Sequence, residues 1–116
     1  MRGIIWYRDH AQAGIDMLKQ VILDYARADI EPSYSRSHFS SNYAWVTFEN
    51  GDEWRIAGAR DSSRGMACNI AYVERSIDYD TYQTIIFPTM KCKPYTAIRL
   101  WGEGNLHLDD SQPLPF

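Results

Sequence analysis

The chain has 116 residues, a formal net charge of −3 and a pI near 5.5. This length suffices for one domain with a core and is too short for two. The charges are interspersed and form no basic patch, so nucleic acid remains a partner only through a local surface. No segment reaches the ~20 apolar residues that span a membrane, and no signal peptide is recognisable. We therefore expect a cytoplasmic protein.

The chain contains two cysteines, Cys68 and Cys92. They lack the CxxC spacing of zinc sites, and no histidine lies close to either, so we expect no zinc. In a cytoplasmic protein both thiols are expected to be reduced and semi-buried.

The N-terminal part of the chain predicts a strand and a helix. Residues 3–7 (GIIWY) are mostly apolar and β-branched or aromatic, which is typical of a buried strand. Residues 11–28 carry apolar side chains at three- and four-residue spacing, which indicates an amphipathic helix. Asp9 is its predicted N-cap, and Pro32 lies just beyond its end. Residues 33–41 are rich in serine and fit either an edge strand or a loop.

Asn50 and Gly51 separate two apolar or alternating runs, 43–48 and 53–57. Asn-Gly in this setting is the strongest short-range hairpin signal, because both residues of a two-residue turn adopt positive φ. We therefore expect a β-hairpin with aromatic cross-strand packing. The four tryptophans lie on predicted strands and are assigned to the core rather than to stacking on nucleic-acid bases. They are Trp6, Trp45, Trp54 and Trp101.

The C-terminal part continues the alternation of strands and helices. A polar loop at 58–66 leads to a strand at 69–73, which we expect at the centre of the sheet. Residues 77–87 predict a second helix over part of their length, and residues 95–101 predict a last strand. This order is typical of an α/β fold, here a small, mainly parallel sheet with a β-hairpin and two flanking helices.

We expect this α/β domain to cover residues 1–102. Residues 103–116 contain a glycine, two prolines and three acidic residues, and they predict a C-terminal tail.

Polar side chains gather where the predicted strand at 69–73 ends. Glu74 and Arg75 follow it directly, and Asp78 and Asp80 lie just beyond. In open α/β sheets, ligands bind at the carboxyl ends of strands. Glu74, Asp78 and Asp80 can together hold Mg²⁺ or Mn²⁺ for hydrolytic chemistry. Alternatively, Glu74 pairs with an arginine such as Arg75 or the one at position 64, and the two aspartates cap the following helix.

Three arginines can contact phosphate. Arg60 and Arg64, with Gly65 beside them, can form an anion- or nucleotide-binding loop, although nothing else in the loop requires it. Arg75 can act in trans as an arginine finger in a partner's nucleotide site, or it can form a surface ion pair.

The order of these motifs resembles the ATPase domain of phage large terminases, the motors that package DNA. In that family a hairpin with an Asn-Gly turn, here Asn50 and Gly51, leads to an Arg-Gly pair, here Arg64 and Gly65. The resemblance covers residues 3–101. It implies a remnant of the P-loop NTPase fold and a phage or prophage origin.

The next strand in that family ends in two acidic residues, the Walker B motif, and a helix and a proline follow. Here the strand ends in Glu74 and Arg75, and Pro88 follows the predicted helix. The resemblance places Glu74 where a magnesium-linked carboxylate sits. It places Arg75 where the residue that orients the attacking water sits.

Two departures argue against ATP hydrolysis by this chain alone. The chain contains no G-x-x-x-x-G-K-[ST] loop to cradle a triphosphate, since it begins at the element that would follow that loop. Arg75 cannot act as a base. We therefore expect no cofactor, apart from Mg²⁺ or Mn²⁺ if the carboxylates bind metal.

These features predict a non-catalytic, phage-derived protein-binding module, either a packaging accessory or an inhibitor of a host system. The strand missing from the sheet would expose an edge or an apolar face, and a protein partner or a second copy would cover it. Two alternatives stay open. One is a metal-dependent nuclease or phosphohydrolase that uses Glu74, Asp78 and Asp80. The other is a fragment of a split packaging ATPase whose phosphate loop lies on another polypeptide.

Overall fold

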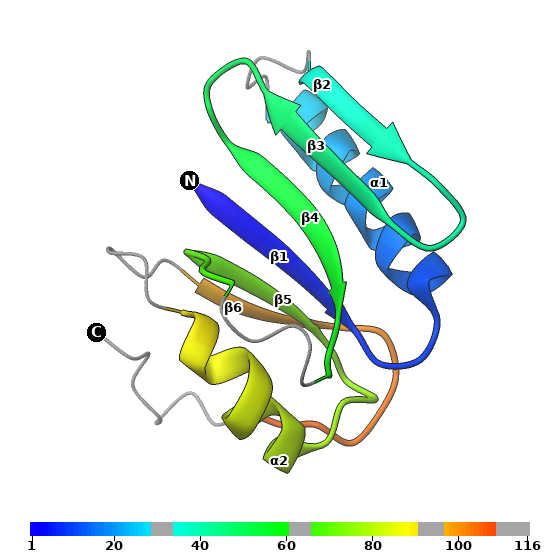
Figure 1. Ribbon diagram of the computed structural model, residues 1–116, viewed down its shortest axis with the longest axis vertical. Helices are drawn as coiled ribbons and strands as arrows, with labels where there is room; N and C mark the ends of the chain where they lie inside the picture. Colours follow the sequence, from blue (N-terminus) through cyan, green and yellow to red (C-terminus); the bar gives the residue numbers. More distant parts are fainter. Residues whose placement is uncertain (29–33, 61–65, 91–96, 109–116) are drawn as a thin grey trace.

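Six strands form one mixed sheet with helices on both faces (Figure 1). The computed structural model describes residues 1–28, 34–60, 66–90 and 97–108. The strands are β1 (Arg2–Tyr7), β2 (Tyr34–Phe39), β3 (Ala44–Phe48), β4 (Glu53–Gly58), β5 (Ile70–Glu74) and β6 (Ala97–Trp101). Their order in the sheet is β2-β3-β4-β1-β5-β6. β1 is parallel to β4 and β5, and β5 is parallel to β6, whereas β3 is antiparallel to both of its neighbours. The predicted α/β class is confirmed.

β1 lies in the middle of the sheet, between β4 and β5. Five of its six residues are buried, which confirms the buried strand predicted at 3–7. The prediction that residues 69–73 form the central strand is wrong, because β5 lies next to the edge strand β6. Both segments are apolar, so their sequences look alike. Their places in the sheet differ because each pairs with strands that are distant in the chain, and the segment's own sequence does not specify that pairing.

α1 (Ala11–Arg27) packs on β1, β3 and β4, and it confirms the helix predicted at 11–28. Its buried positions follow the predicted stripe. They are Gly14, Ile15, Leu18, Val21 and Tyr25. The predicted N-cap is wrong, since His10 holds that position and makes no side-chain capping bond. The Asp9 carboxylate lies 3.6 Å from Nε of Arg8 instead.

Of the two alternatives for residues 33–41, an edge strand and a loop, the structure has the edge strand, which is β2. Among the described strands it pairs only with β3, at one end of the sheet. The pairing register shifts between Tyr34 and Arg36, which marks an irregularity near the start of the strand.

The hairpin predicted around Asn50 and Gly51 is confirmed, with β3 and β4 as its strands. The Phe48 N–H donates to the Asp52 carbonyl at 2.8 Å, so the loop holds three residues rather than the two of a simple Asn-Gly turn. Gly51 adopts a φ of 96°, which a residue with a side chain rarely does.

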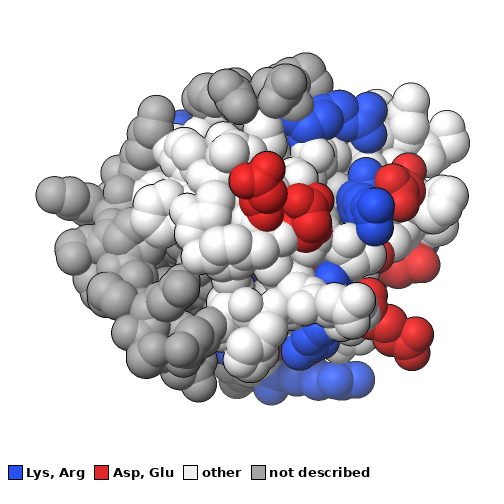
Figure 2. Space-filling view, turned by 90° about the horizontal axis from the view of Figure 1, so that it is seen from below, with Lys and Arg blue, Asp and Glu red and all other residues white. Residues whose placement is uncertain are grey.

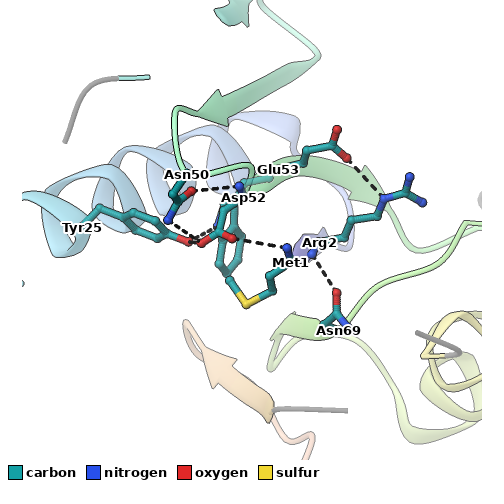
Figure 3. Close-up of polar contacts among 8 residues, drawn as sticks. Met1, Arg2, Tyr25, Asn50, Asp52, Glu53 and Asn69 are labelled. Carbon is teal, nitrogen blue, oxygen red and sulfur yellow. Dashed lines mark hydrogen bonds and ion pairs between the residues drawn. The ribbon is translucent and has the colours of Figure 1, made fainter. Parts of the chain in front are cut away.

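Asp52 ties the hairpin to α1 and to the start of β1 (Figure 3). Its carboxylate accepts the Tyr25 hydroxyl at 2.7 Å and lies 3.3 Å from the Met1 amino group. Trp54 Nε1 donates to the same hydroxyl at 2.9 Å, and Asn50 Oδ1 accepts the Asp52 N–H at 2.9 Å. Burial, and then the hydrogen bond to Asp52, raise the pKa of Tyr25. The hydroxyl therefore remains a neutral donor at physiological pH.

The helix predicted over part of 77–87 is confirmed, and it runs from Tyr79 to Thr89 as three consecutive short helical stretches. They are α2 (Tyr79–Thr81), a π-helical turn (Tyr82–Ile86) and a 3₁₀ turn (Phe87–Thr89), together called the α2 segment. Thr84 Oγ1 donates to the Asp80 carbonyl at 3.0 Å, a side-chain bond that competes with the backbone ladder and bends helices. Pro88 lies in the last of the three turns.

Each face of the sheet has its own core. The α1 core consists of Ile5, Tyr7, Ile15, Leu18, Val21, Tyr25, Ala44, Val46, Phe48, Trp54 and Ile56. The α2 core consists of Ile4, Trp6, Ala57, Cys68, Ala71, Val73, Ile77, Tyr82, Ile85, Ile86, Met90 and Leu106. Leu106 comes from the segment predicted as a tail, and its N–H donates to the Arg75 carbonyl at 3.0 Å. This part of the segment therefore packs against the domain.

Within the described ranges, no helix is long and apolar enough to cross a membrane. The Cys68 side chain is fully buried rather than semi-buried. Cys92 lies outside the described residues.

Candidate functional site

The carboxyl ends of β1 and β5 lie side by side and lead to opposite faces of the sheet. β1 continues into α1 on one face, and β5 continues into the α2 segment on the other (Figure 1). In doubly wound sheets such a switch point is where ligands bind. The predicted site residues at positions 74 to 80 follow β5 at this point.

Glu74, the last residue of β5, bridges the two strand ends. Its Oε1 accepts the backbone N–H of Arg8, the first residue after β1, at 2.9 Å. Arg8 Nη1 donates in turn to the Ser76 carbonyl at 3.1 Å. The alternative ion pair between Glu74 and Arg75 does not form, and the alternative pair with Arg64 lies outside the described residues.

Arg75 contacts the carboxyl end of β6 rather than that of β1. Its Nη1 donates to the Gly102 carbonyl at 3.0 Å, and its own backbone carbonyl accepts the Leu106 N–H at 3.0 Å. The guanidinium thus holds the turn that follows β6. An arginine finger would need this group to leave Gly102 and reach a partner, so that role stays a prediction.

Asp78 caps α2. Its Oδ2 accepts the Thr81 N–H at 3.1 Å, and its Oδ1 accepts the Thr81 hydroxyl at 2.6 Å. These bonds from the Thr81 hydroxyl and backbone lower the pKa of Asp78. The capping interpretation is therefore confirmed for Asp78, whereas Asp80 is exposed in the first turn of α2.

The three carboxylates predicted as a metal site have separate surroundings. Glu74 faces the end of β1, Asp78 caps α2, and Asp80 is exposed. Within the described part of the chain, no group of three or more His, Cys, Asp or Glu side chains is placed to hold a metal ion.

Asp78→Ala is expected to lower the melting temperature by a few degrees, because α2 loses its cap. Asp78→Asn keeps an oxygen acceptor and should melt close to the wild type. The pKa of Asp78 is lowered in the folded protein, so the capping contribution is present above the ordinary aspartate pKa. It is lost as the pH falls through the lowered folded value. Thermal unfolding of the three proteins between pH 2 and pH 7 checks this, and equal losses for both variants would contradict a capping role.

The predicted anion loop is described only at its start. Arg60 is exposed, and its N–H donates to the Gly58 carbonyl at 2.9 Å. Its guanidinium lies over Gly58, because a Cβ placed there would be 2.7 Å from Arg60 Nε. Arg64 and Gly65 lie outside the described residues. Anion binding by this loop therefore stays a prediction.

Basic and acidic side chains are interspersed on the side of the molecule where the α2 segment lies (Figure 2). On the described part of this side, neither sign gathers over a large area. Local potentials of opposite sign therefore partly cancel here.

A second candidate site lies on the side of β2, β3 and β4 that faces away from α1. Its side chains form two rows across the strands, since His38, Trp45 and Arg55 are register partners, and so are Arg36, Thr47 and Glu53. Tyr43 adjoins the first row, and these seven residues are called the open face. A cavity of about 640 Å³ is lined by members of this set, together with residues of β1 and the segment before β5.

The open face was not predicted from the sequence, where Trp45 is assigned to the core. Trp6 and Trp54 are buried as expected, but Trp45 and Trp101 are only half-buried. The strict alternation of buried and partly exposed residues in β3 is the signal that places Trp45 opposite the α1 core.

Comparisons with protein-family models, with curated proteins and with solved structures find no match to this chain. The chemistry of both candidate sites therefore rests on the residues described above.

Proposed function

We propose that this protein is a non-catalytic binding module that accepts an extended protein segment as an added strand on β2. The observation that carries the proposal is the position of β2, which lies at the end of the sheet and, in the part of the chain that the structure describes, pairs with β3 alone. Such an edge presents unpaired backbone groups that a strand of another chain can bind.

The backbone of β2 alternates between groups that face β3 and groups that face outward. Ser40 N–H donates to the Tyr43 carbonyl at 2.9 Å, and paired residues alternate between bonded and non-bonded positions along an antiparallel ladder. This alternation directs the N–H and C=O groups of Ser37 and Phe39 away from β3. The Phe39 side chain is 41% exposed, so the edge also offers apolar contact.

A second copy of the chain supplies a matching segment, because two β2 strands can pair across a twofold axis. Self-association through β2 is therefore the interaction to test first.

The contacts at the carboxyl end of β5 support a non-catalytic role. Glu74, Arg75 and Asp78 each bind a group of their own chain, so none of them is poised toward a substrate. If the nuclease alternative holds, Mg²⁺ or Mn²⁺ will raise the melting temperature and Glu74→Ala will abolish the rise. We expect no rise in either protein.

We also infer that the fold is a remnant of a P-loop NTPase, related to the terminase ATPase and of phage or prophage origin. Support comes from the parallel strands around β1 and from Glu74 at the carboxyl end of the adjacent strand β5. In this proposal the protein acts in the cytoplasm as a packaging accessory or as an inhibitor of a host system. A split packaging ATPase would instead show ATPase activity on co-expression with the chain that carries the phosphate loop.

The association test uses Ser37→Pro. Proline removes the outward N–H of β2 and leaves the bonds to β3 in place, so a wild-type dimer should become a monomer in sedimentation velocity. Ser37→Ala keeps the N–H and should remain dimeric. A wild type that stays monomeric at its highest soluble concentration would contradict self-association. Dimerisation that survives in Ser37→Pro would place the interface elsewhere.

A further inference from the structure

We propose that the open face binds single-stranded nucleic acid. Trp45 lies at its centre, between His38 on β2 and Arg55 on β4. Phe48 and Asp52 form a hydrogen-bonded pair, so alternation along the ladder makes Trp45 and Arg55 a non-bonded pair. Side chains lie closest together in such pairs. An indole and a guanidinium therefore stand side by side on this face.

The aromatic rings form a surface on which bases can stack. The rings of His38 and Trp45 are nearly parallel, at 19°, with centroids 6.4 Å apart. The Tyr43 ring lies 6.2 Å from that of His38, and its residue is 37% exposed. Stacking on aromatic rings contributes to binding of single strands whatever the base, because every base has a π-face.

The charges of the open face complement phosphate. Among the described residues that line the cavity, Glu53 is the one acidic residue, and it is paired with Arg2 at 3.3 Å. Within the described part of the chain, Arg36 and Arg55 take part in no ion pair. Two guanidinium groups beside the rings can therefore contact two phosphates of a strand whose bases stack on the face.

Other ligands match only part of this surface. Paired bases in a duplex present no free face to the rings, and its dense phosphates are poorly matched to a chain of net charge −3. An acidic peptide would satisfy the arginines but brings no planar groups of its own to the rings. The cavity of about 640 Å³ is large enough for a nucleotide, since small-ligand sites span roughly 300–1,000 Å³.

Fluorescence anisotropy with labelled 15-mers of deoxythymidine and of uridine tests the proposal. We expect both to bind at low salt and an equally long duplex to bind at least tenfold more weakly. A difference between the two 15-mers would tell whether the ribose is read. For two phosphate contacts, log K should fall with log salt at a slope of about −1.4, and Arg55→Gln should reduce the slope to about −0.7. Trp45→Ala should weaken binding about tenfold or more.

Arg99→Gln is the matched control. Arg99 is an exposed strand arginine whose register partner, Tyr72, packs against the α1 core, so it lies on the opposite face. This variant loses the same charge and should bind like the wild type. Each variant's melting temperature shows whether it is folded. No binding by the wild type, equal binding of the duplex, or equal losses in Arg99→Gln and Arg55→Gln would overturn the proposal.

The site does not depend on strand addition at β2. Ser37→Pro is therefore expected to retain binding of the 15-mers even when it is monomeric. Loss of binding together with dimerisation would mean that the nucleic-acid site exists only between two copies, which would overturn the site as proposed.

Discussion

Gly3→Ala is expected to destabilise the protein by about 3 kcal/mol, at the upper end of the usual cost of overpacking a core. A Cβ at Gly3 would lie 2.4 Å from two ring carbons of Trp54, its register partner on β4. The ring cannot move aside easily, because Trp54 Nε1 donates to the Tyr25 hydroxyl at 2.9 Å and the ring packs edge-on against Tyr72. The indole of Trp54 therefore fills the space that a side chain at position 3 would need.

A double-mutant cycle separates this clash from any effect on the backbone of β1. Leucine at position 54 is shorter than the indole, so Gly3→Ala should cost less than about 1 kcal/mol in a Trp54→Leu background. Urea unfolding of the four proteins measures the difference. An equal cost of Gly3→Ala in both backgrounds would show that the clash with the ring is not the cause.

The elements predicted correctly from the sequence are those with local signals. The apolar stripe of α1 and the Asn50-Gly51 turn each lie within one short window of sequence. The place of β5 in the sheet and the change from α-helical to π- and 3₁₀-helical geometry within the second helix depend on more than such a window. β5 pairs with strands at both ends of the chain, and the Thr84 bond to the Asp80 carbonyl is only one of several arrangements open to a threonine.

The sequence indicated where the site at the end of β5 lies, but not which of its residues contact each other. Asp78 and Thr81 are three residues apart, so the cap can be read locally. Glu74 and Arg8 are 66 positions apart, and they meet because the parallel register places Trp6 opposite Val73. No pattern within either segment encodes that register. The sequence alone therefore suggested an arginine side chain, rather than a backbone N–H, as the partner of Glu74.

The open face, too, could be predicted only in part from the sequence. Alternation along β3 separates Trp45 from the buried Val46, and this can be read from the sequence. Which side of the sheet stays uncovered depends on where the α2 segment packs, and this follows from the position of β5 beyond β1. The α2 segment covers β1 and β5, and within the described part of the chain His38 and Arg55 stay exposed and Trp45 half-buried. The strand order also puts β2 at the end of the sheet, so both proposals rest on it.

Trp6→Ala is expected to cost about 4 kcal/mol, as large-to-small changes of buried aromatic residues do. Trp6 is fully buried in the α2 core, and its register partners, Ala57 and Val73, are too small to fill the cavity that its removal would leave. Trp6→Phe should cost less than half as much, because the indole Nε1 has no hydrogen-bond partner among the described residues, so its loss breaks no bond. Urea unfolding measures both changes. If Trp6→Phe costs as much as Trp6→Ala, the Nε1 group makes a bond that matters to the fold. If both variants keep the anisotropy change with the deoxythymidine 15-mer, binding at the open face does not depend on Trp6. We expect this result, because the described ring contacts of His38, Tyr43 and Trp45 do not include Trp6.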